Sequence, residues 1–404
     1  GHRVVGTDFD KKTVDDLQRG DPPIYEPGLK ELIKKHLGKT LNFEFDKGKA
    51  LSNADFIFIT FDTPVDEQDK PDLTPIINAA QEISKHVSEE VIVVVSSQVP
   101  VGTCDEIKKI ISQNSQREID VCYLPENLRL GQALESFLKP ERLVLGVNSK
   151  KTFEKVNEIF APLKCKVLEM SVRSAEMAKH ALNAYLATCI SFANEISDLC
   201  EAHGASAIDV VKAMKTDKRV GKFAPLAPGL GFSGGTLARD VQVLRALGAK
   251  AGCKTHILDA VVNVNEKRKH LVLNKLRKVF GDVLSLKVGI LGLTYKPGTD
   301  TLRRSLALEV ARELIASGMR VKAYDPKISG QINEVPELQV CSSMEEVADG
   351  CDVLVLMTEW PEFKDLSPEK LKKVMKRPII LDPKNFLDGE KLMKAGFEYY
   401  GVGV

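Results

Sequence analysis

The sequence predicts an α/β protein in which two doubly wound domains are joined by an all-α central domain built on a long helix. Short β-branched runs alternate with helical stretches in residues 1–170 and again in 281–404, which is the pattern of right-handed βαβ units. Residues 171–280 carry no strand signal, and their apolar positions recur at helical spacing. We therefore expect three domains with these boundaries.

The first domain is expected to hold a parallel sheet that is covered on both faces. Its strand candidates are near-continuous apolar runs rather than alternating ones, as burial on both faces requires. Strands are expected at residues 3–7, 55–60, 91–96, 121–124, 142–147 and 167–170, with helices between them, for example at 73–86 and 103–113.

The central domain is expected to begin with one long amphipathic helix. Apolar residues spaced by three and four run from Ala175 to Leu199 and predict a helix of about 30 residues over 171–202. Further helices are expected at 207–214, 241–251 and around 257–280, with a loop rich in Gly and Pro at 225–240.

The alternation of strands and helices restarts in the third domain. No short repeat is present, so the two βα halves are expected to be separate domains rather than parts of a solenoid. The expected elements are strands at 287–293, 320–326, 353–360 and 379–383, and a helix at 306–317.

Composition excludes several classes of partner. The chain has 57 Lys and Arg against 56 Asp and Glu, so no net basic field exists to hold nucleic acid or an anionic membrane. No apolar run approaches the length of a membrane span. The eight cysteines are scattered, with no CxxC and no His/Cys cluster, which predicts no metal site and no disulfide framework. We expect a cytoplasmic protein.

Two acidic residues, Asp8 and Asp10, end the first expected strand. In a dinucleotide-binding fold, an acidic residue about 20 positions after a GxGxxG turn binds the ribose hydroxyls. Counting back that far from Asp8 passes the start of the chain. We expect that the first strand and its glycine turn are missing, and that the 404-residue chain binds NAD poorly. The alternative is that Asp8 only caps the strand end.

Motifs along nearly the whole chain share one family resemblance. They include PIYEPGL within 6–33, SSQVPVGT at 96–103, PENLRLG at 125–131, SAEMAKHALNAYLA at 174–187 and LGLTYKPGTDTLRRS at 291–305. Together they resemble the UDP-glucose/GDP-mannose dehydrogenase family. The resemblance implies two Rossmann-like domains, for NAD and for the nucleotide sugar (UDP), joined by a helical dimerisation region. Such enzymes oxidise a sugar C6 alcohol to a carboxylate in two NAD-dependent steps.

The resemblance also implies a set of catalytic residues. Lys179 and Asn183 are four apart, so they share one helix face. In the family these positions hold the reacting oxygen and a water, and Asp240 orients them. Glu126, at the end of an expected strand, falls on the family's acid/base glutamate. Without the resemblance, the first pair reads as a solvated polar stripe and Glu126 as an ordinary loop carboxylate.

Further residues are assigned to ligands by the same resemblance. For the cofactor NAD they are Asp8 on the adenosine ribose, Thr63, Gln98 and Arg303. For the nucleotide sugar they are Gly231, Phe232 and Gly234 in the glycine-rich loop, and Lys296 and Lys384 in the third domain. Cations beside a helix N-terminus suit a diphosphate, although Lys384, at a position where the family usually has Arg, cannot form a bidentate fork. The alternative for the third-domain residues is a solvated charged turn.

The glycine-rich loop departs from the family at its reactive position. Thr236 stands where the family has a catalytic cysteine, and a threonine hydroxyl needs a dedicated base to act as a nucleophile. Gln98 replaces a water-binding threonine, and Leu130 replaces a glutamate that many members carry. Cys189 lies about 15 Å along the helix from Lys179 and is expected in the core. The first-oxidation residues are therefore expected to be intact and the second-oxidation residues altered.

The sequence as a whole predicts an NAD-dependent nucleotide-sugar dehydrogenase that acts on a UDP- or GDP-hexose and forms a homodimer through its central helices. Two alternatives remain open. One is a dehydrogenase that stops at the aldehyde or ketone, because the cysteine is absent. The other is a nucleotide-sugar-binding paralogue without turnover. The three possibilities differ in yielding two, one or no NADH per sugar.

Overall fold

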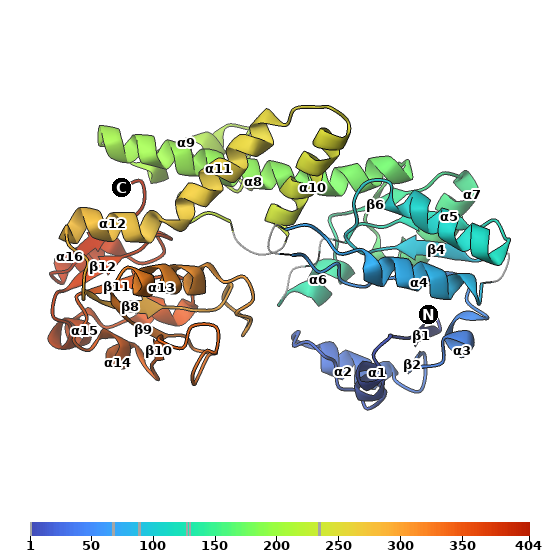
Figure 1. Cartoon of the computed structure of the whole chain (residues 1–404), viewed down its shortest axis with the longest axis horizontal. Coiled ribbons are helices and arrows are strands. Elements are labelled where there is room, and N and C mark those ends of the chain that lie inside the picture. Colours follow the sequence, from blue (N-terminus) through green and yellow to red (C-terminus); the bar gives the residue numbers. More distant parts are fainter. Residues whose placement is uncertain (1, 67–68, 88–89, 127, 129–130, 233–235) are drawn as a thin grey trace. The chain divides into compact units, whose positions relative to one another are not determined.

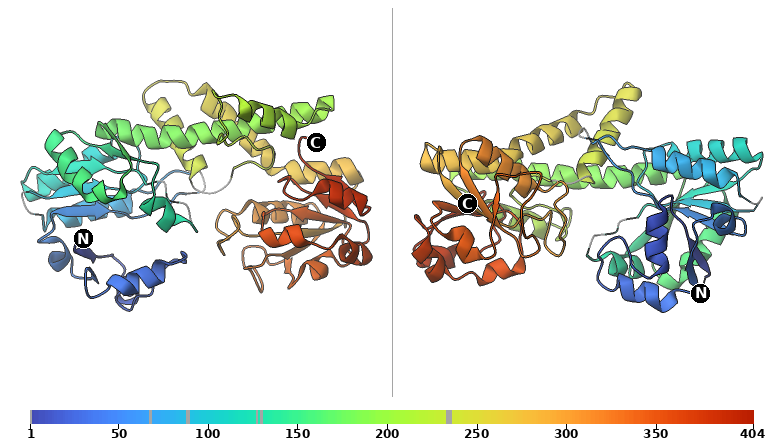
Figure 2. Two further views of the ribbon diagram at one scale, coloured as in Figure 1. Left: turned by 180° about the vertical axis from the view of Figure 1, so that it is seen from behind. Right: turned by 60° about the horizontal axis from the view of Figure 1, so that its bottom comes forward.

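The computed structural model describes residues 2–404 apart from 67–68, 88–89, 127, 129–130 and 233–235 (Figure 1). The chain forms two compact units, Gly1–Ala181 and Leu182–Val404, and their boundary falls inside helix α8 (Val172–His203). Figure 2 shows the long course of α8 from two further sides. The predicted α/β fold class is confirmed, with a mainly parallel sheet in each unit and a long helix in the central region of the chain. The three domain boundaries stay a prediction.

The N-terminal unit is built on a five-stranded sheet with the order β3-β4-β5-β6-β7. All four residues of β4 are buried, which explains the continuous apolar run in the sequence. Helices α4 and α5 pack side by side against this sheet (Figure 1). The strands of the unit are β1 (Val4–Gly6), β2 (Leu41–Phe43), β3 (Phe56–Ile59), β4 (Ile92–Val95), β5 (Asp120–Tyr123), β6 (Arg142–Gly146) and β7 (Lys166–Met170).

Helices alternate with these strands as expected. Asp10, Asp46 and Ser149 begin three of them by accepting hydrogen bonds from main-chain N–H groups of the first turn. The helices are α1 (Lys11–Gln18), α2 (Leu29–His36), α3 (Lys47–Leu51), α4 (Thr74–Ser84), α5 (Thr103–Ser115), α6 (Ala133–Leu138) and α7 (Lys150–Phe160).

Two details of this sheet differ from the expected arrangement. Strand β1 pairs with the short strand β2, which the sequence analysis missed, and forms a separate two-stranded sheet. The ends of β1 and β3 still meet, because the rings of Phe9 and Phe61 stack with centroids 5.4 Å apart. In addition, β6 meets β5 in antiparallel pairing at Tyr123 and Gly146, so the sheet is not parallel throughout.

The C-terminal unit contains a six-stranded, wholly parallel sheet with the order β10-β9-β8-β11-β12-β13. The chain turns from one side of β8 to the other between β10 and β11, which makes the carboxyl ends of β8 and β11 a topological switch point. The strands are β8 (Lys287–Leu291), β9 (Arg320–Tyr324), β10 (Gln339–Val340), β11 (Val353–Leu356), β12 (Ile379–Leu381) and β13 (Glu398–Tyr400).

The helices of this unit depart from expectation at two points. Helix α10 begins at Leu237, directly after Thr236, rather than at 241. The stretch around 257–280 divides at His270, which ends α11 and begins α12 with a backbone outside the helical region. The helices are α9 (Ala207–Thr216), α10 (Leu237–Lys250), α11 (His256–Lys269), α12 (Leu271–Phe280), α13 (Leu306–Ala316), α14 (Met344–Ala348), α15 (Pro368–Val374) and α16 (Gly389–Lys394).

Burial confirms the expected core position of Cys189 and also places the tryptophan. Cys189 lies in a core cluster between α8 and α9 together with Ala193 and Val211. The single tryptophan, Trp360, is buried in the core of the C-terminal sheet. Among the residues that the structure describes, no helix combines the length and the apolar character that a membrane span requires.

Candidate functional site

Hydroxyl side chains tie together the carboxyl ends of β3, β4 and β5. Thr63, after β3, donates a hydrogen bond of 2.8 Å to the main-chain oxygen of Gln98 after β4. Ser96 donates one of 2.9 Å to the main-chain oxygen of Leu124 after β5. The structure thus brings the predicted cofactor residues Thr63 and Gln98 together at the sheet edge where ligands of such sheets bind. Thr63 is itself buried, so its direct contact is with the Gln98 loop.

One turn of α8 reaches these strand ends with three polar side chains, of which Glu176 is the first. It is fully buried, and its carboxylate accepts hydrogen bonds from the main-chain N–H groups of Gly102 and Cys104, at 2.6 and 2.9 Å. A carboxylate at the start of α5 is favoured by the N–H groups and dipole of that helix. Burial, followed by the Glu176 carboxylate, raises the pKa of the Cys104 thiol, which makes that thiol unreactive.

The other two side chains of this turn are Lys179 and His180, both buried. His180 Nε2 lies 2.8 Å from the main-chain oxygen of Val99, so this nitrogen carries the proton. The Lys179 ammonium donates a hydrogen bond of 2.6 Å to the main-chain oxygen of Glu126. Sequence reasoning missed Glu176 and His180. Glu176 lies three positions before Lys179 and four before His180, and this helical spacing was the available signal.

Glu126 lies in the loop after β5 and is half-buried. Its side-chain Oε2 accepts a hydrogen bond of 2.6 Å from the N–H of Leu128 in the same loop. The structure therefore brings Lys179 and Glu126 together, as the sequence analysis expected for two catalytic residues. The contact is to the main chain of Glu126, and its carboxylate accepts from Leu128 N. A carboxylate in a loop at a sheet edge is suited to exchanging a proton with a bound water or hydroxyl.

Asp8 follows β1 and is partly exposed. Its Oδ1 accepts a hydrogen bond of 2.8 Å from the N–H of Asp10, and it is Asp10 that caps α1. The helix-capping role therefore belongs to Asp10, and Asp8 retains acceptor capacity at the strand end. A carboxylate accepts hydrogen bonds from neighbouring ribose hydroxyls. The residues present at β1 thus fit the adenosine ribose of NAD.

The C-terminal unit pairs Asn183 with Asp240. The Asn183 Nδ2 donates a hydrogen bond to Asp240 Oδ2, and both side chains are buried, the aspartate completely. Asp240 lies in the first turn of α10, where the helix dipole favours its negative charge. Thr236 is the N-cap of the same helix, is exposed, and makes no side-chain capping bond. Asn183 itself follows Lys179 by one turn of α8.

Two asparagines hold the start of the glycine-rich loop. Asn194 Oδ1 accepts a bond of 2.9 Å from Gly229 N, and the Asn265 amide bonds both Phe232 N and Phe232 O, at 2.8 and 3.1 Å. A Cβ on Gly231 would overlap Asn265, which explains that glycine. The Phe232 side chain packs in the helical core, so this predicted substrate residue is engaged within the protein. Gly234, like Leu130, lies outside the described residues.

The switch point of the C-terminal sheet collects the predicted nucleotide residues Lys296 and Lys384 and also Arg303, which was predicted to contact the cofactor. Lys296 and Arg303 lie in the turn between β8 and α13, where Arg303 is exposed and Lys296 half-buried. Lys384 follows β12, and its ammonium lies 3.3 Å from the carboxylate of Glu359, which follows β11. The carboxyl ends of β8, β11 and β12 are neighbours in the parallel sheet. Cations at this edge are suited to a diphosphate.

Asp325 distinguishes this half from a dinucleotide-binding half. It follows the second strand of its sheet, as Asp8 follows β1, but it is buried. Its Oδ2 accepts hydrogen bonds from Leu293 N and Thr294 N, at 2.7 and 2.9 Å, and from the Trp360 indole at 3.1 Å. The carboxylate is thus used to fix the turn after β8 and is withdrawn from any ribose.

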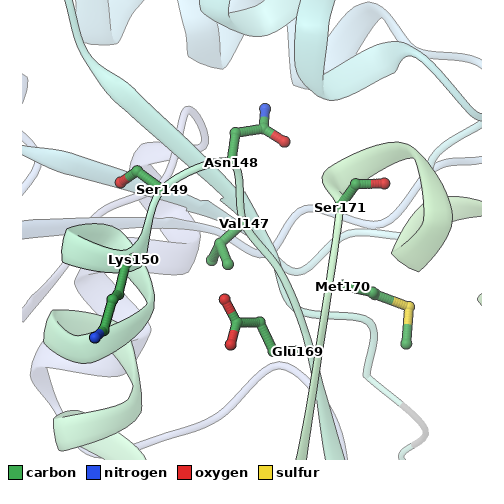
Figure 3. A pocket seen from close by; sticks show the side chains of 7 residues that line it. All are labelled: Val147, Asn148, Ser149, Lys150, Glu169, Met170 and Ser171. Atoms are coloured by element: carbon green, nitrogen blue, oxygen red, sulfur yellow. The ribbon is translucent and has the colours of Figure 1, made fainter.

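Figure 3 shows an open depression of about 500 Å³ at the ends of β6 and β7. The helices that begin there are capped by their own serines: Ser149 accepts a hydrogen bond from Thr152 N, and Ser171 accepts one from Ser174 N. None of the predicted site residues that the structure describes lines it, and we assign it no ligand. It is lined by Val147, Asn148, Ser149, Lys150, Glu169, Met170 and Ser171.

Known proteins resemble this chain over its whole length. It is 35% identical to the UDP-glucose 6-dehydrogenase YwqF of Bacillus subtilis, over 100% of this chain and 92% of that protein. The chain belongs to the UDP-glucose/GDP-mannose dehydrogenase family. The family's NAD binding domain matches residues 1–164, its central domain 173–267 and its UDP binding domain 289–389.

Other members of the UDP-glucose/GDP-mannose dehydrogenase family agree in sequence and in structure. The UDP-glucose 6-dehydrogenase of Rhizobium meliloti is 36% identical over 100% of this chain and 94% of its own. The solved UDP-glucose dehydrogenase of Pyrobaculum islandicum superposes with a TM-score of 0.89 at 30% identity, covering 99% of this chain and 92% of that one. The cofactor of the chain is NAD, and the chain is an oxidoreductase of nucleotide sugars.

Proposed function

We propose that this protein oxidises the C6 alcohol of a UDP-hexose, with UDP-glucose the first candidate and a GDP-hexose the second. The observation that carries the proposal is α8, which places Lys179 against Glu126 and, one turn later, Asn183 against the buried Asp240. The curated relatives support the choice of sugar nucleotide, since they are UDP-glucose 6-dehydrogenases. A UDP binding domain at 289–389 agrees with it.

In the proposed reaction the side chains act on one sugar oxygen. The Lys179 ammonium donates a hydrogen bond to that oxygen and stabilises negative charge as the hydroxyl proton leaves. Asn183, whose amide is oriented by Asp240, positions a water beside it. Glu126 exchanges a proton with that water. NAD, when bound, supplies the hydride acceptor, with Asp8, Thr63, Gln98 and Arg303 as its proposed protein contacts.

The proposed nucleotide contacts lie in the C-terminal sheet. Lys296 at the turn after β8 and Lys384 after β12 supply positive charge for the diphosphate. The carboxylate of Glu359 lies 3.3 Å from the Lys384 ammonium, so it neutralises part of the positive charge that Lys384 offers to the diphosphate. By the family resemblance, Gly231 and Gly234 of the glycine-rich loop stay proposed contacts of the sugar nucleotide.

A second candidate function follows from Thr236. This residue is exposed at the N-cap of α10, and its hydroxyl makes no capping bond. A threonine there cannot form the thiohemiacetal through which a cysteine promotes the second oxidation. The chain would then stop at the aldehyde or ketone. A paralogue that binds nucleotide sugars without turnover is the remaining alternative.

The first experiment compares sugar nucleotides as substrates. The chain is expected to reduce NAD with UDP-glucose at least ten times faster, by kcat/KM, than with GDP-mannose, when NADH is followed by absorbance at saturating NAD. UDP alone should inhibit competitively against the sugar nucleotide. Absence of NADH with every UDP-hexose, despite UDP binding measured by calorimetry, would establish the non-catalytic alternative.

We also propose that the protein is a homodimer through its central helices. Tyr185, Phe192 and Leu199 lie seven apart on α8 and are 60%, 47% and 52% exposed. Large apolar side chains at this spacing form one stripe along a helix face, which a second copy would cover.

We further propose a cytoplasmic location, with which the eight free cysteines agree.

Replacing Phe192 by glutamate is expected to convert the dimer to a monomer, because a charge in the middle of the stripe opposes burial. Light scattering at micromolar concentration measures the mass. Glu337→Gln, at an exposed position shortly before β10, serves as the control and should leave the dimer intact. A monomeric unmodified chain at that concentration would remove the basis of the dimer proposal.

A further inference from the structure

Glu26 is a buried carboxylate that the mechanism above does not use. It lies between α1 and α2, in the segment PIYEPGL, and is 6% exposed. Both of its carboxylate oxygens accept main-chain hydrogen bonds from the loop between β5 and α6. Oε2 accepts from Gly131 N and Oε1 from Ala133 N, each at 2.7 Å. The partners are 105 and 107 positions away in the sequence.

The loop that Glu26 holds is the one that carries Glu126. Near its start, the main-chain oxygen of Glu126 accepts a hydrogen bond of 2.6 Å from the Lys179 ammonium. Near its end, the N–H groups of Gly131 and Ala133 are bound by Glu26. An ammonium thus binds a carbonyl at one end of the loop, and a carboxylate binds two N–H groups at the other.

The contact is strong because the carboxylate has few other ways to satisfy its charge. Within the described ranges, no Lys, Arg or His forms an ion pair with Glu26, and the two loop N–H groups are its hydrogen-bond donors. Hydrogen bonds to an ionised acceptor are about twice as strong as neutral ones. If these donors were lost, a buried charge would remain unpaired, so the arrangement strongly favours the observed placement of Gly131 and Ala133.

We propose that Glu26 is a positioning residue, which fixes Gly131 and Ala133 at the end of the segment that follows Glu126, so that the Glu126 carboxylate is held in the place proton transfer requires. This inference rests on the proposed role of Glu126. The PIYEPGL segment, through Glu26, would thus help to position the segment that carries Glu126. A displacement of about 1 Å at a reacting group can lower a rate about 100-fold, so the link is expected to matter for turnover.

The test compares Glu26→Gln with Glu31→Gln, an exposed glutamate of α2 five positions away, in the full chain. Glu26→Gln removes the charge and keeps the shape. It is expected to lower kcat about 10- to 100-fold, with KM for NAD and the calorimetric Kd for UDP changed less than twofold. Without any ligand, amide exchange in the peptide covering 131–138 should become at least tenfold faster. Glu31→Gln should change none of these.

Ala133→Pro provides an independent variant from the loop side. It removes one N–H donor at the first position of α6, a position whose N–H has no partner within the helix. If Glu26 acts through this bond, the double variant should lose less kcat than the product of the two single losses. It also keeps the test open if Glu26→Gln fails to fold.

The outcomes separate this inference from the proposed function. Normal kcat in Glu26→Gln, or unchanged exchange of 131–138, overturns the positioning role while Glu126→Gln remains impaired. If Glu126→Gln itself retains full kcat, the proposed role of Glu126 fails, and the positioning role fails with it whatever the exchange shows. Multiplicative losses in the double variant also overturn the inference.

Discussion

About one NADH is formed per sugar by the unmodified chain, and Thr236→Cys raises the number toward two; this is the result we expect from the exposed Thr236 at the N-cap of α10. A cysteine is partly thiolate at neutral pH and attacks an aldehyde directly, whereas a threonine hydroxyl needs a dedicated base. Loss of an activated nucleophile costs orders of magnitude in rate, so the two proteins should differ clearly. NADH absorbance at saturating NAD gives the stoichiometry, and hydroxylamine traps the carbonyl product.

The matched control for this prediction is Thr255→Cys. Thr255 is also a threonine at a helix N-cap, that of α11, and it likewise makes no side-chain capping bond. This variant should keep one NADH per sugar. Gln98, which replaces the family's water-binding threonine, limits how far the stoichiometry of Thr236→Cys rises. Rapid release of a uronate with two NADH by the unmodified chain would show that the second oxidation proceeds without a cysteine at this position.

Lys179→Met is expected to lower kcat for the first oxidation about 100- to 1,000-fold, the loss typical when one donor to a developing oxyanion is removed. Methionine fills similar space but cannot donate to the sugar oxygen or to the main-chain oxygen of Glu126, now 2.6 Å from the ammonium. The UDP affinity should stay within threefold, because the proposed UDP contacts lie in the C-terminal sheet. Steady-state NADH formation and UDP calorimetry measure the two effects.

Arg173→Met is the matched control for Lys179→Met. Arg173 lies on the same helix, is paired with Asp105 at 2.7 Å and is largely exposed, so its loss should leave kcat unchanged. A Lys179→Met variant that retains a third of the original kcat would contradict the catalytic role. A fall in UDP affinity equal to the fall in kcat would indicate misfolding rather than a lost donor.

Local spacing in the sequence was enough to predict part of the site. Lys179 and Asn183 were placed on one helix face by their spacing of four, and Glu126 at a strand end by the apolar run before it. Both placements hold in the structure, because helix period and strand position are local properties. Their catalytic roles stay predictions.

Contacts between distant segments could not be predicted in this way. Glu26 reads as one more charge in a Pro-rich segment until the fold brings it to residues 131–133. Phe232 reads as a loop side chain, yet it is buried among α8, α10 and α11. Strand β2 was missed because its three residues, alternating only once, carry too little pattern to separate a strand from a loop.

Because Asp325 is buried, the C-terminal βα half cannot take over the dinucleotide-binding role of the N-terminal half. Grafting a glycine-rich turn onto the C-terminal half would not create a second dinucleotide site. The carboxylate it needs is already bonded to Leu293 N, Thr294 N and the Trp360 indole, and freeing it would leave these donors buried and unpaired. Converting the C-terminal half into a dinucleotide site would therefore require rebuilding the hydrogen bonds around Asp325 as well as the glycine turn.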